Sequence, residues 1–483
     1  MILVIDVGTT GLRAAVVRPD ASLVATEYRS FSPDSPFPGM VEFDAGRLGE
    51  LVLGAAHAVL ASCGHPSISG VGIAAQRAST VVWERSTGRP IGPAIGWQDL
   101  RTVGDCLTVR AEHGLTLAPN QSATKLTWLL ANAASDRDHS DLCFGTIDTW
   151  VAWTLSQGSL HITDHTNAAI TGLYSIETGG WHTGVCELLG VDTSMLPTIV
   201  DSSGVVGAAT ALPGAPPIAS LAGDQQASLV GQGCIQPGMA KITFGTGGML
   251  DLCTGSKRPQ AADRSTDGTF PIIAWSSAGE IAWGSEAIML SAGTNVEWLR
   301  DDLGLIDTAA ESHDVASRCK TSDGVVYVPA LLGLGTPYWD YGARGTLLGL
   351  TRGTERPQVV RAVLEGVAHR GADMVEAAQS DTGHDIPTLR IDGGMSRNPT
   401  FVQALANASG KPVEVSPVVE ATTVGAAFLA GVATGLWSDL GETSTAWAPH
   451  AYVEPNAQLD RATWARAIER TASWIPELSA LDF

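Results

Sequence analysis

The sequence predicts an α/β protein built from two domains. Three observations lead to this prediction: the chain has 483 residues, its N-terminal part alternates strand-like and helix-like segments, and a strand–turn–strand pattern with a Gly-Thr-x-Gly turn occurs once in each half. A chain of this length exceeds what one hydrophobic core usually supports, so two domains are expected. Alternation of strands and helices is typical of α/β folds.

The elements of the N-terminal half follow from hydrophobic patterning. A helical pattern runs from about Asp44 to Leu60. An acid, Asp6, interrupts the first apolar strand directly before its turn, where the pattern would place another Val or Ile. Apolar runs predict strands at 2–7, 12–18, 22–30 and 68–76.

The pattern of the opening strands returns in the C-terminal half. The segment 203–219 is rich in Gly, Ala and Pro, carries no charge and predicts an irregular connection. Beyond it, MAKITFGTGGMLDLCTG at 239–255 again predicts strand, turn and strand, and LRIDGGMSRNP at 389–399 predicts a strand ending in Asp-Gly-Gly. The segment 461–478 predicts an amphipathic helix.

Composition excludes several classes of partner. A formal net charge of −21 disfavours nucleic acid and anionic membranes. The seven cysteines are odd in number and form no C-x-x-C pair, which fits a reducing cytosol and argues against a disulfide framework or a zinc site. No apolar run approaches the roughly 20 residues that span a bilayer, and no basic residue precedes the first apolar run as in a signal peptide. We therefore expect a cytoplasmic protein.

The two Gly-Thr turns predict a phosphate site. Glycine lets backbone N–H groups converge on an anion, and Thr hydroxyls add donors. Two turns facing a cleft could hold a phosphate chain from opposite sides, with Asp6 directed at an accompanying magnesium ion. Two unrelated β-hairpins with glycine turns are the alternative, and the spacing alone leaves both interpretations open.

Seven further segments carry a family resemblance. In chain order they are AQRASTVVWERSTGRPIGPAIGWQDLRT (75–102), SATKLTWLL (122–130), FGTIDTW (144–150), TDHTNAA (163–169), GDQQASLVGQG (223–233), GLGTPYWDYGARGTLLGLTRG (333–353) and EATTVGAAFLAGVATGLW (420–437). Over nearly its whole length the chain resembles the FGGY carbohydrate kinases, and within them the glycerol kinases. The resemblance implies the actin-like ATPase fold, with two ribonuclease-H-like domains, at 1–235 and 236–483, around a central cleft that holds ATP and a sugar.

The resemblance also implies the cofactors ATP and Mg²⁺. Asp6 matches a carboxylate near the magnesium, and Asp224 is expected close to the same ion. Glu297 stands where glycerol kinases often have Gln. The other matching nucleotide positions are Gly8, Thr9, Thr10 and Arg13 in the first phosphate loop, Gly245 and Thr246 in the second, and Gly293, Gly394 and Asn398 around the rest of the nucleotide. The small residues Gly425, Ala426, Ala427, Ala430 and Gly431 are expected to serve close helix packing.

Asp224 matches the catalytic base of the family, which takes a proton from the acceptor hydroxyl as that hydroxyl attacks the γ-phosphorus. From its local pattern alone, Gly-Asp-Gln-Gln before Ala-Ser-Leu-Val, Asp224 is instead typical of a helix N-cap, and both roles can hold at once.

The acceptor pocket departs from the glycerol kinase pattern. Arg77, Trp97, Asp224 and Gln225 match it, whereas Ala78, Asn120 and Met249 stand where Glu, Tyr and Phe are usual. A substrate hydroxyl left unpaired loses roughly ten- to a hundredfold in affinity. The resemblance therefore implies phosphorylation of a terminal hydroxyl of glycerol or a related small polyol, with a larger polyol or a ketose as the alternative acceptor.

Two readings from other classes stay open at this point: an ATP-driven assembly protein and a catalytically silent sugar sensor. Arg77, Trp97 and Asp224, which match sugar-kinase positions, argue against an assembly protein, and the retained Asp224 and Thr246 argue against a silent sensor. Relatives form homodimers or homotetramers, so an oligomer is possible. The segment 203–219 carries no Lys or Arg, so we predict no inhibition by an anionic sugar phosphate there.

Overall fold

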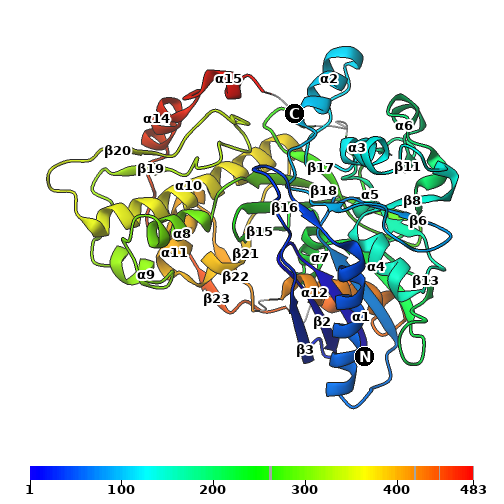
Figure 1. The fold of residues 1–483 in the computed structure, drawn as a ribbon. Helices are drawn as coiled ribbons and strands as arrows, with labels where there is room; N and C mark the ends of the chain where they lie inside the picture. Colours follow the sequence, from blue (N-terminus) through cyan, green and yellow to red (C-terminus); the bar gives the residue numbers. More distant parts are fainter. Residues whose placement is uncertain (260–263, 418–419, 445–446, 482–483) are drawn as a thin grey trace.

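One sheet runs through the whole molecule (Figure 1). The computed structural model describes residues 1–259, 264–417, 420–444 and 447–481. Within these ranges, thirteen strands hydrogen-bond side by side in the order β23-β22-β21-β15-β16-β18-β17-β13-β14-β5-β1-β2-β3. Helices cover this sheet, and the N-terminal and C-terminal halves of the chain contribute its two ends (Figure 1).

The two ends of the sheet repeat one topology. In the N-terminal half, β1 pairs antiparallel with β2 and parallel with β5, β2 pairs antiparallel with β3, and β5 pairs parallel with β14. In the C-terminal half, β15, β16, β18, β21 and β22 take the places of β1, β2, β3, β5 and β14, with the same directions. The predicted α/β fold with two similar halves is confirmed.

The strands of this repeat have the following bounds in the N-terminal half: β1 Ile2–Val7, β2 Gly11–Val17, β3 Leu23–Ser30, β5 Gly70–Ala75 and β14 Pro217–Gly223. Those of the C-terminal half are β15 Ala240–Phe244, β16 Gly248–Gly255, β18 Glu280–Met289, β21 Leu389–Asp392 and β22 Val413–Val415. The edge strand β23 spans Ala451–Val453. The strands expected from the opening apolar runs and from 239–255 and 389–399 are therefore confirmed.

The segment 203–219 is an irregular connection, as predicted, only over 209–216. It forms β13 (Ser203–Ala208) and the start of β14, an antiparallel pair in the middle of the sheet. β13 also pairs with β17 (Phe270–Ser277) through Ser203 and Ser277, which joins the two halves. β14 is buried from Ile218 to Gly223, whereas β13 is mostly half-buried and Val205 is exposed, so pairing with the neighbouring strands, not composition, makes β13 a strand.

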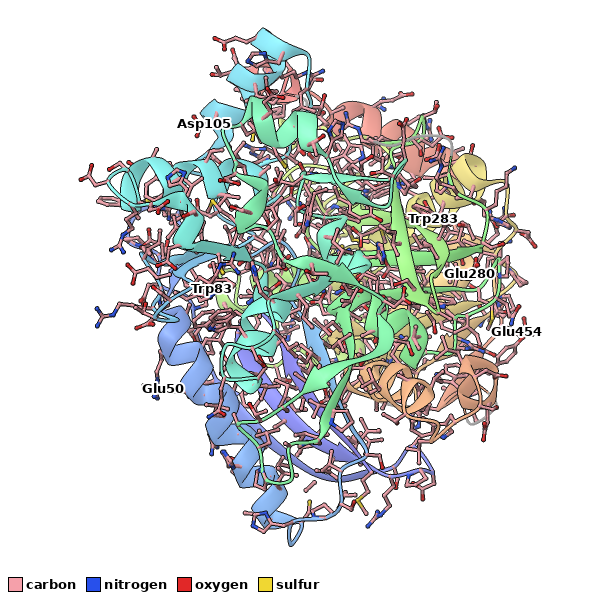
Figure 2. The ribbon with its side chains drawn as sticks, turned by 90° about the vertical axis from the view of Figure 1, so that its right-hand side faces the viewer. Glu50, Trp83, Asp105, Glu280, Trp283 and Glu454 are labelled. Carbon is pink, nitrogen blue, oxygen red and sulfur yellow. The ribbon has the colours of Figure 1, made fainter. Side chains whose placement is uncertain are left out.

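Helix α1 (Ala45–Ser62) follows the prediction, and the Asp44 side chain caps it by accepting from Arg47 N at 3.0 Å. It packs on β2 and β3 and turns Glu50 away from the sheet (Figure 2). Trp83, on β6 (Val81–Glu84), is fully buried against Trp150 and fills the core of this half. This half also contains β4 Glu42–Phe43, β7 Ala94–Ile95, α2 Val103–His113, α3 Ala123–Ala133, β8 Leu142–Gly145, α4 Ile147–Leu155, β9 Ile162–Asp164, α5 His165–Ala168, β10 Tyr174–Ser175, β11 Gly180–Trp181, α6 Thr183–Leu188 and β12 Thr198–Val200.

Two helices, α7 (Asp224–Gly231) and α12 (Ala421–Ala433), pack closely between the halves. A Cβ on Gly425 would lie 1.7 Å from Ala227 O, and one on Gly231 would lie 2.0 Å from Ala421 O. Such distances are possible only without side chains at both crossing points. The expected role of the small residues of α12 in close packing is confirmed.

Helix α10 (Arg356–Thr382) forms the long core helix of the C-terminal half. The predicted amphipathic helix at 461–478 is shorter than expected, because α14 (Arg461–Thr471) ends before Ser473, whose φ is 56°. The remaining elements of this half are α8 Thr294–Asp301, α9 Glu311–Ala316, β19 Val326–Val328, β20 Thr346–Leu348, α11 Pro399–Ser409, α13 Leu440–Ser444 and α15 Pro476–Ser479. Within the described ranges, no helix has the length and apolar character needed to span a bilayer.

Candidate functional site

The first Gly-Thr turn is a tight loop between β1 and β2. Gly8 N donates to Gly11 O at 2.9 Å and closes the loop. Thr10 O accepts from Phe31 N at 3.0 Å, which fixes the turn against the end of β3. Trp97 Nε1 donates to Thr9 Oγ1 at 3.3 Å. The structure thus brings Trp97, predicted for the acceptor, against a residue predicted for the phosphates.

The second turn, between β15 and β16, lies against the start of α8. Gly293 N donates to Gly245 O at 2.8 Å, and Ala292 N donates to Thr246 O at 2.8 Å. A Cβ on Gly293 would lie 2.6 Å from Gly245 O. Glycine is therefore required at 293 for this close approach, and the structure brings together three residues predicted for the nucleotide.

Asp6 is a buried carboxylate near the end of β1. Its Oδ2 accepts from Thr423 Oγ1 at 3.0 Å and lies 3.7 Å from Arg13 Nη1. Arg13 also forms an ion pair with Glu420, the residue that precedes α12. Burial raises the pKa of Asp6 to about 7, against the opposing effects of Arg13 and Thr423, and the charge of Asp224 raises it further.

Asp224 is the first residue of α7 and directly follows β14. Its Oδ1 accepts from Gln225 N at 2.8 Å and lies 3.9 Å from Arg77 Nε. Burial raises its pKa and the Arg77 charge lowers it. The helix cap is Gly223, not Asp224, so the alternative reading of Asp224 as an N-cap is wrong. A carboxyl group in the first helical turn is still favoured by the helix dipole.

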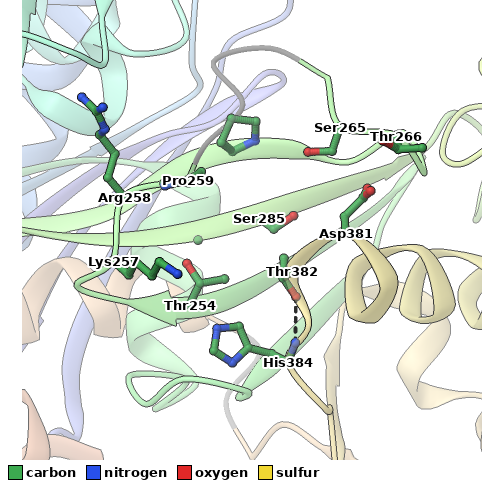
Figure 3. Close-up of a pocket in the computed structure, with 12 residues that line it drawn as sticks. Thr254, Lys257, Arg258, Pro259, Ser265, Thr266, Ser285, Asp381, Thr382 and His384 are labelled. Atoms are coloured by element: carbon green, nitrogen blue, oxygen red, sulfur yellow. Dashed lines mark hydrogen bonds between the residues drawn. The ribbon is translucent and has the colours of Figure 1, made fainter.

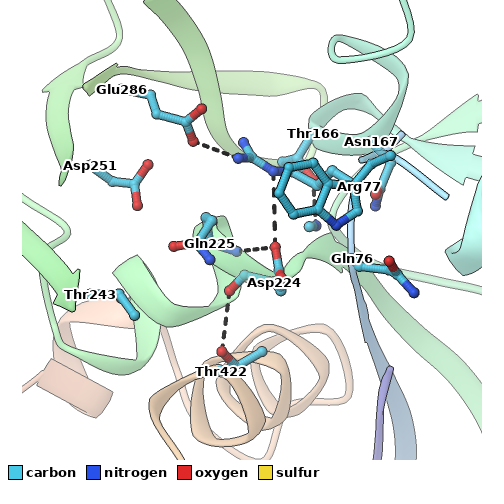
Figure 4. A network of polar contacts seen from close by, with 12 residues as sticks. Gln76, Arg77, Thr166, Asn167, Asp224, Gln225, Thr243, Asp251, Glu286 and Thr422 are labelled. Atoms are coloured by element: carbon cyan, nitrogen blue, oxygen red, sulfur yellow. Dashed lines mark hydrogen bonds and ion pairs between the residues drawn. The ribbon is translucent and has the colours of Figure 1, made fainter. Parts of the chain in front are cut away.

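Arg77 bridges the two halves of the molecule (Figure 4). It lies two residues beyond the end of β5, and its Nη2 lies 2.7 Å from Glu286 Oε2 on β18. The two charges keep 10% and 6% of their side-chain surface exposed. Because the pair is nearly dry, its attraction is much less screened than that of a surface pair.

A second buried ion pair lies beside the first. Lys241 Nζ is 2.7 Å from Asp251 Oδ2, and both side chains are fully buried. Lys241 Nζ also donates to Gln225 Oε1 at 2.7 Å and to Thr243 Oγ1 at 2.9 Å. In the sheet, Asp251 is directly opposite Lys241 on one side and Glu286 on the other. Burial and the Asp251 charge raise the pKa of Glu286 to about 7.

The three changed acceptor positions lie on different elements. Ala78 is buried with φ 60°, and its carbonyl accepts from Ser122 Oγ at 3.0 Å. Asn120 is exposed, and Met249 is half-buried on β16. The buried Lys125 links two predicted acceptor residues: its Nζ donates to Trp97 O at 3.1 Å and to Asn120 O at 3.3 Å. Burial lowers the pKa of Lys125 to about 7.

The predicted nucleotide residues beyond the two turns lie near α8, β21 and α11. Gly394 begins a short 3-10 helix after β21, and a Cβ there would meet open space. The Asn398 side chain caps α11, accepting from Phe401 N at 3.1 Å and donating to Ser312 Oγ at 2.8 Å. Glu297, in the first turn of α8, is exposed.

Two hollows lie away from the residues around Arg77 and Asp224. One, of about 620 Å³, borders the end of β21 and is lined by Gly393, Arg397 and His450 among others. The other, of about 420 Å³, is lined by Thr254, Lys257, Ser285 and His384 among others (Figure 3). Neither contains a residue of the predicted catalytic or acceptor set among its lining residues.

Sequence reasoning missed Glu286, Asp251 and Lys241. The signal that singled out Asp6, a charge inside an apolar strand, is also present in WGSEAIML, MLDL and AKITF. A buried charge in a strand needs a partner, so each of these three was a candidate for a site. In the described part of the chain, no group of three or more His, Cys, Asp or Glu side chains forms an all-protein metal site. Magnesium usually binds through only one or two carboxylates together with phosphates, so this is compatible with a metal at Asp6.

Comparison with known proteins identifies two family domains. Residues 1–231 match the model of the N-terminal domain of the FGGY family of carbohydrate kinases, and residues 240–434 match the model of its C-terminal domain.

Curated relatives of similar length are named glycerol kinase. The chain is 41% identical to a protein named glycerol kinase from Aromatoleum aromaticum, over 98% of this chain and 99% of that protein. It is 39% identical to a glycerol kinase from Deinococcus radiodurans, over 98% of each chain.

Solved structures have the same fold. The crystal structure of Plasmodium falciparum glycerol kinase with ADP superposes with a TM-score of 0.90 at 29% identity, covering 98% of both chains. A ligand-bound xylulose kinase from Lactobacillus acidophilus superposes with a TM-score of 0.83 at 21% identity, covering 99% of both chains. These superpositions confirm the predicted actin-like ATPase fold.

Proposed function

The chain belongs to the FGGY family of carbohydrate kinases and is an ATP-dependent kinase, and we propose that it transfers the γ-phosphoryl group of ATP to a terminal hydroxyl of glycerol. The observation that carries this proposal is the 39–41% identity to proteins named glycerol kinase over nearly the full chain. The retained acceptor residues Arg77, Trp97 and Gln225 support it, because all three contact the cluster around Asp224 or the first turn.

In this proposal the two Gly-Thr turns hold the phosphate chain of ATP. Two observations support this role of the turns. The backbones of Gly245 and Gly293 lie so close that a Cβ on Gly293 would clash with Gly245 O. Both turns also lie at the ends of corresponding strands in the two halves. Gly8, Thr9, Thr10 and Arg13 would act from one side, and Thr246 from the other. Gly394, Asn398 and Glu297 would bound the rest of the nucleotide.

Asp6 and Asp224 would hold magnesium. The donor chemistry fits, because Asp6 is a buried and Asp224 a half-buried carboxylate, and desolvation raises the pKa of both, a cost that a bound cation would remove. Magnesium would neutralise charge on the phosphate oxygens during transfer. Arg13 would keep the carboxylate of Asp6 in place through its ion pairs with Asp6 and Glu420.

Asp224 would act as the general base. A base must reach the proton that it accepts, and Asp224 is fixed at the start of a helix between the acceptor residues and Asp6. It would take the proton of the acceptor hydroxyl as that oxygen attacks the γ-phosphorus, while Arg77 and Gln225 orient the acceptor. Closure of the two halves, which we propose at residues 1–235 and 236–483, would exclude water that would otherwise compete as the acceptor.

A larger polyol or a ketose is the second candidate acceptor. The observation in its favour is that Ala78, Asn120 and Met249 replace larger or charged residues of the glycerol kinase pattern. A cytoplasmic location is also proposed, supported by the free state of all seven cysteines. A homodimer or homotetramer is proposed from the family alone.

The test is ADP release from Mg-ATP with glycerol, erythritol, threitol, xylitol, ribitol, arabitol, xylulose, ribulose and dihydroxyacetone. Preference for glycerol, with loss of activity in EDTA and its return with Mg²⁺, supports the proposal. Preference for a five-carbon acceptor would transfer it to the second candidate. Absence of acceptor-stimulated ADP release across the panel would overturn it.

A further inference from the structure

Arg77 is a buried cation that needs a carboxylate partner, and its neighbour in the sequence, Ala78, does not provide one. Position 78 offers only a methyl group, and its backbone is fixed with φ 60°. The carbonyl of Ala78 is engaged by Ser122 Oγ at 3.0 Å and by Thr80 Oγ1 at 3.2 Å. An isolated buried guanidinium would be very costly, so its partner has to come from elsewhere in the fold.

The partner is Glu286, from the opposite half of the molecule. Its Oε2 lies 2.7 Å from Arg77 Nη2, and the pair is almost excluded from solvent. Arg77 Nη1, in contrast, is buried and has no hydrogen-bond partner within the described residues. An unpaired buried donor is costly, and a ligand oxygen at this point would satisfy it. One arm of the guanidinium is thus held by the ion pair with Glu286, and the other arm lacks a hydrogen-bond partner.

The clamp is continuous with the group that holds Gln225. Asp251 lies opposite Glu286 in the β16–β18 register, and both carboxylates are drawn in Figure 4. Asp251 forms an ion pair with Lys241, which donates to Gln225 Oε1. The carboxylates of Glu286 and Asp251 therefore lie between two cations: Arg77, which is itself a predicted acceptor residue, and Lys241, which holds Gln225. A rigid polar network of this kind can preserve the orientation of both residues.

We propose that Glu286 is a positioning residue for the acceptor: it clamps one arm of Arg77 so that the other arm donates to a second hydroxyl of the substrate. This inference rests on the proposed function and deepens it. It also defines the acceptor class as a polyol with a hydroxyl beside or near the one that is phosphorylated. A simple mono-alcohol would leave Arg77 Nη1 unpaired.

Without Glu286, the nearest carboxylate to Arg77 is Asp224, whose Oδ1 lies 3.9 Å from Arg77 Nε. The guanidinium is then expected to turn toward Asp224 and away from the acceptor. The loss should appear in acceptor binding much more than in nucleotide binding, since the two Gly-Thr turns and Asp6 do not contact Glu286.

The experiment compares wild type with Glu286→Gln, which keeps the shape of the side chain, and Glu286→Asp, which keeps the charge. The matched control is Glu414→Gln, which removes the partner of Arg390 at 3.0 Å in the same sheet but away from the acceptor. KM and kcat are measured for glycerol and for ATP, together with the melting temperature. Glycerol is compared with 1,2-propanediol and 1,3-propanediol, each of which lacks one hydroxyl.

For Glu286→Gln we expect the KM of glycerol to rise about 10- to 100-fold, with the KM of ATP within about twofold of wild type. The preference for glycerol over at least one diol should fall about tenfold, because Arg77 no longer donates a hydrogen bond to the hydroxyl that this diol lacks. Glu286→Asp should restore part of the preference, and Glu414→Gln should match wild type.

A Glu286→Gln variant that keeps both the KM of glycerol and the preference over both diols would overturn the inference while leaving the proposed function intact. Equal losses for glycerol and ATP, with a lower melting temperature, would show a general structural role and overturn it as well. A wild-type protein that phosphorylates no polyol would overturn the proposed function and this inference with it.

Discussion

Asp6 Oδ2 accepts a hydrogen bond from Thr423 Oγ1 at 3.0 Å, although 417 positions separate these residues in the sequence. The bond joins the end of the first strand to the first turn of α12. It stabilises a carboxylate whose burial alone would favour the protonated form. The acid that interrupts the first apolar strand is therefore held by a helix from the far end of the chain.

Asp6→Asn tests the proposed magnesium role. The substitution keeps the size of the side chain and removes its charge, so the cation loses a carboxylate oxygen. We expect kcat to fall about 100-fold or more, and the Mg²⁺ concentration for half-maximal rate to rise. The measurement is ADP release at fixed ATP and glycerol over a Mg²⁺ titration. An unchanged Mg²⁺ dependence would show that Asp6 does not serve the metal.

Thr423→Val tests the contact between strand and helix. Valine keeps the branched shape, so the loss is confined to the hydrogen bond to Asp6, worth about 1.5–3 kcal/mol to a charged group. We expect a rise in the KM of Mg-ATP of about tenfold with the KM of glycerol little changed. Thr434→Val is the matched control, because its hydroxyl bonds within α12 to Ala430 O at 2.9 Å. Equal effects of the two variants would contradict a specific role of Thr423.

Asp224→Asn removes the proposed base without removing its volume. General base catalysis contributes about 10²- to 10⁴-fold, so kcat should fall within that range. Because Asp224 is also proposed to hold magnesium, the Mg²⁺ concentration for half-maximal rate should rise as well, whereas the KM of ATP at saturating Mg²⁺ should stay within about threefold. Steady-state kinetics with saturating glycerol give both numbers. A variant that keeps more than a tenth of the wild-type kcat would exclude Asp224 as the base.

The parts of the site that the sequence predicted are those carried by local pattern. The turns at Gly8 and Gly245 follow apolar strands, and Asp6 is conspicuous because it interrupts one. The helix start at Asp224 was also visible, although the cap proved to be Gly223. Such features depend on a few adjacent residues, which makes them readable without knowing the fold.

The part that escaped prediction depends on pairing across the two halves. Glu286 contacts Arg77 only because the fold brings β18 beside the loop that follows β5. Likewise, β13 could not be told from a loop, since its small residues become a strand only between β14 and β17. Both are tertiary effects, and local propensity does not encode them.

Met249→Phe tests whether the changed pocket admits larger acceptors. Met249 lies two positions before Asp251 on β16, so the side chains share one face of the sheet about 7 Å apart. A rigid ring there should reduce kcat/KM for pentitols about tenfold and leave that for glycerol unchanged or improved. The acceptor panel measures this ratio. Parallel changes for glycerol and pentitols would show that position 249 does not set acceptor size.

Asp148, with Asp164 close by, makes the stability of the folded protein fall as the pH rises from about 4 to about 7. Asp148 is fully buried, and its Oδ2 accepts from Thr163 Oγ1 at 2.7 Å. Burial, with the nearby charge of Asp164, raises its pKa from 3.8 to about 7. The folded protein thus keeps a proton that the unfolded chain releases near pH 4. The stability that this group contributes is complete below that pH and is lost as the pH rises through about 7.

Asp148→Asn removes this titration, because the amide stays neutral at every pH and can still bond to Thr163. We expect the stability of the variant relative to wild type to be about 2–3 kcal/mol greater at pH 8.5 than at pH 5. Urea unfolding at both pH values measures the difference. The control is Asp20→Asn: Asp20 is exposed, and its hydrogen bonds to Ser22 lower its pKa, so it is ionised at both pH values. The prediction is contradicted if the stability difference between Asp148→Asn and wild type is the same at both pH values. A change in that difference requires a carboxyl group at position 148 that titrates between pH 5 and 8.5.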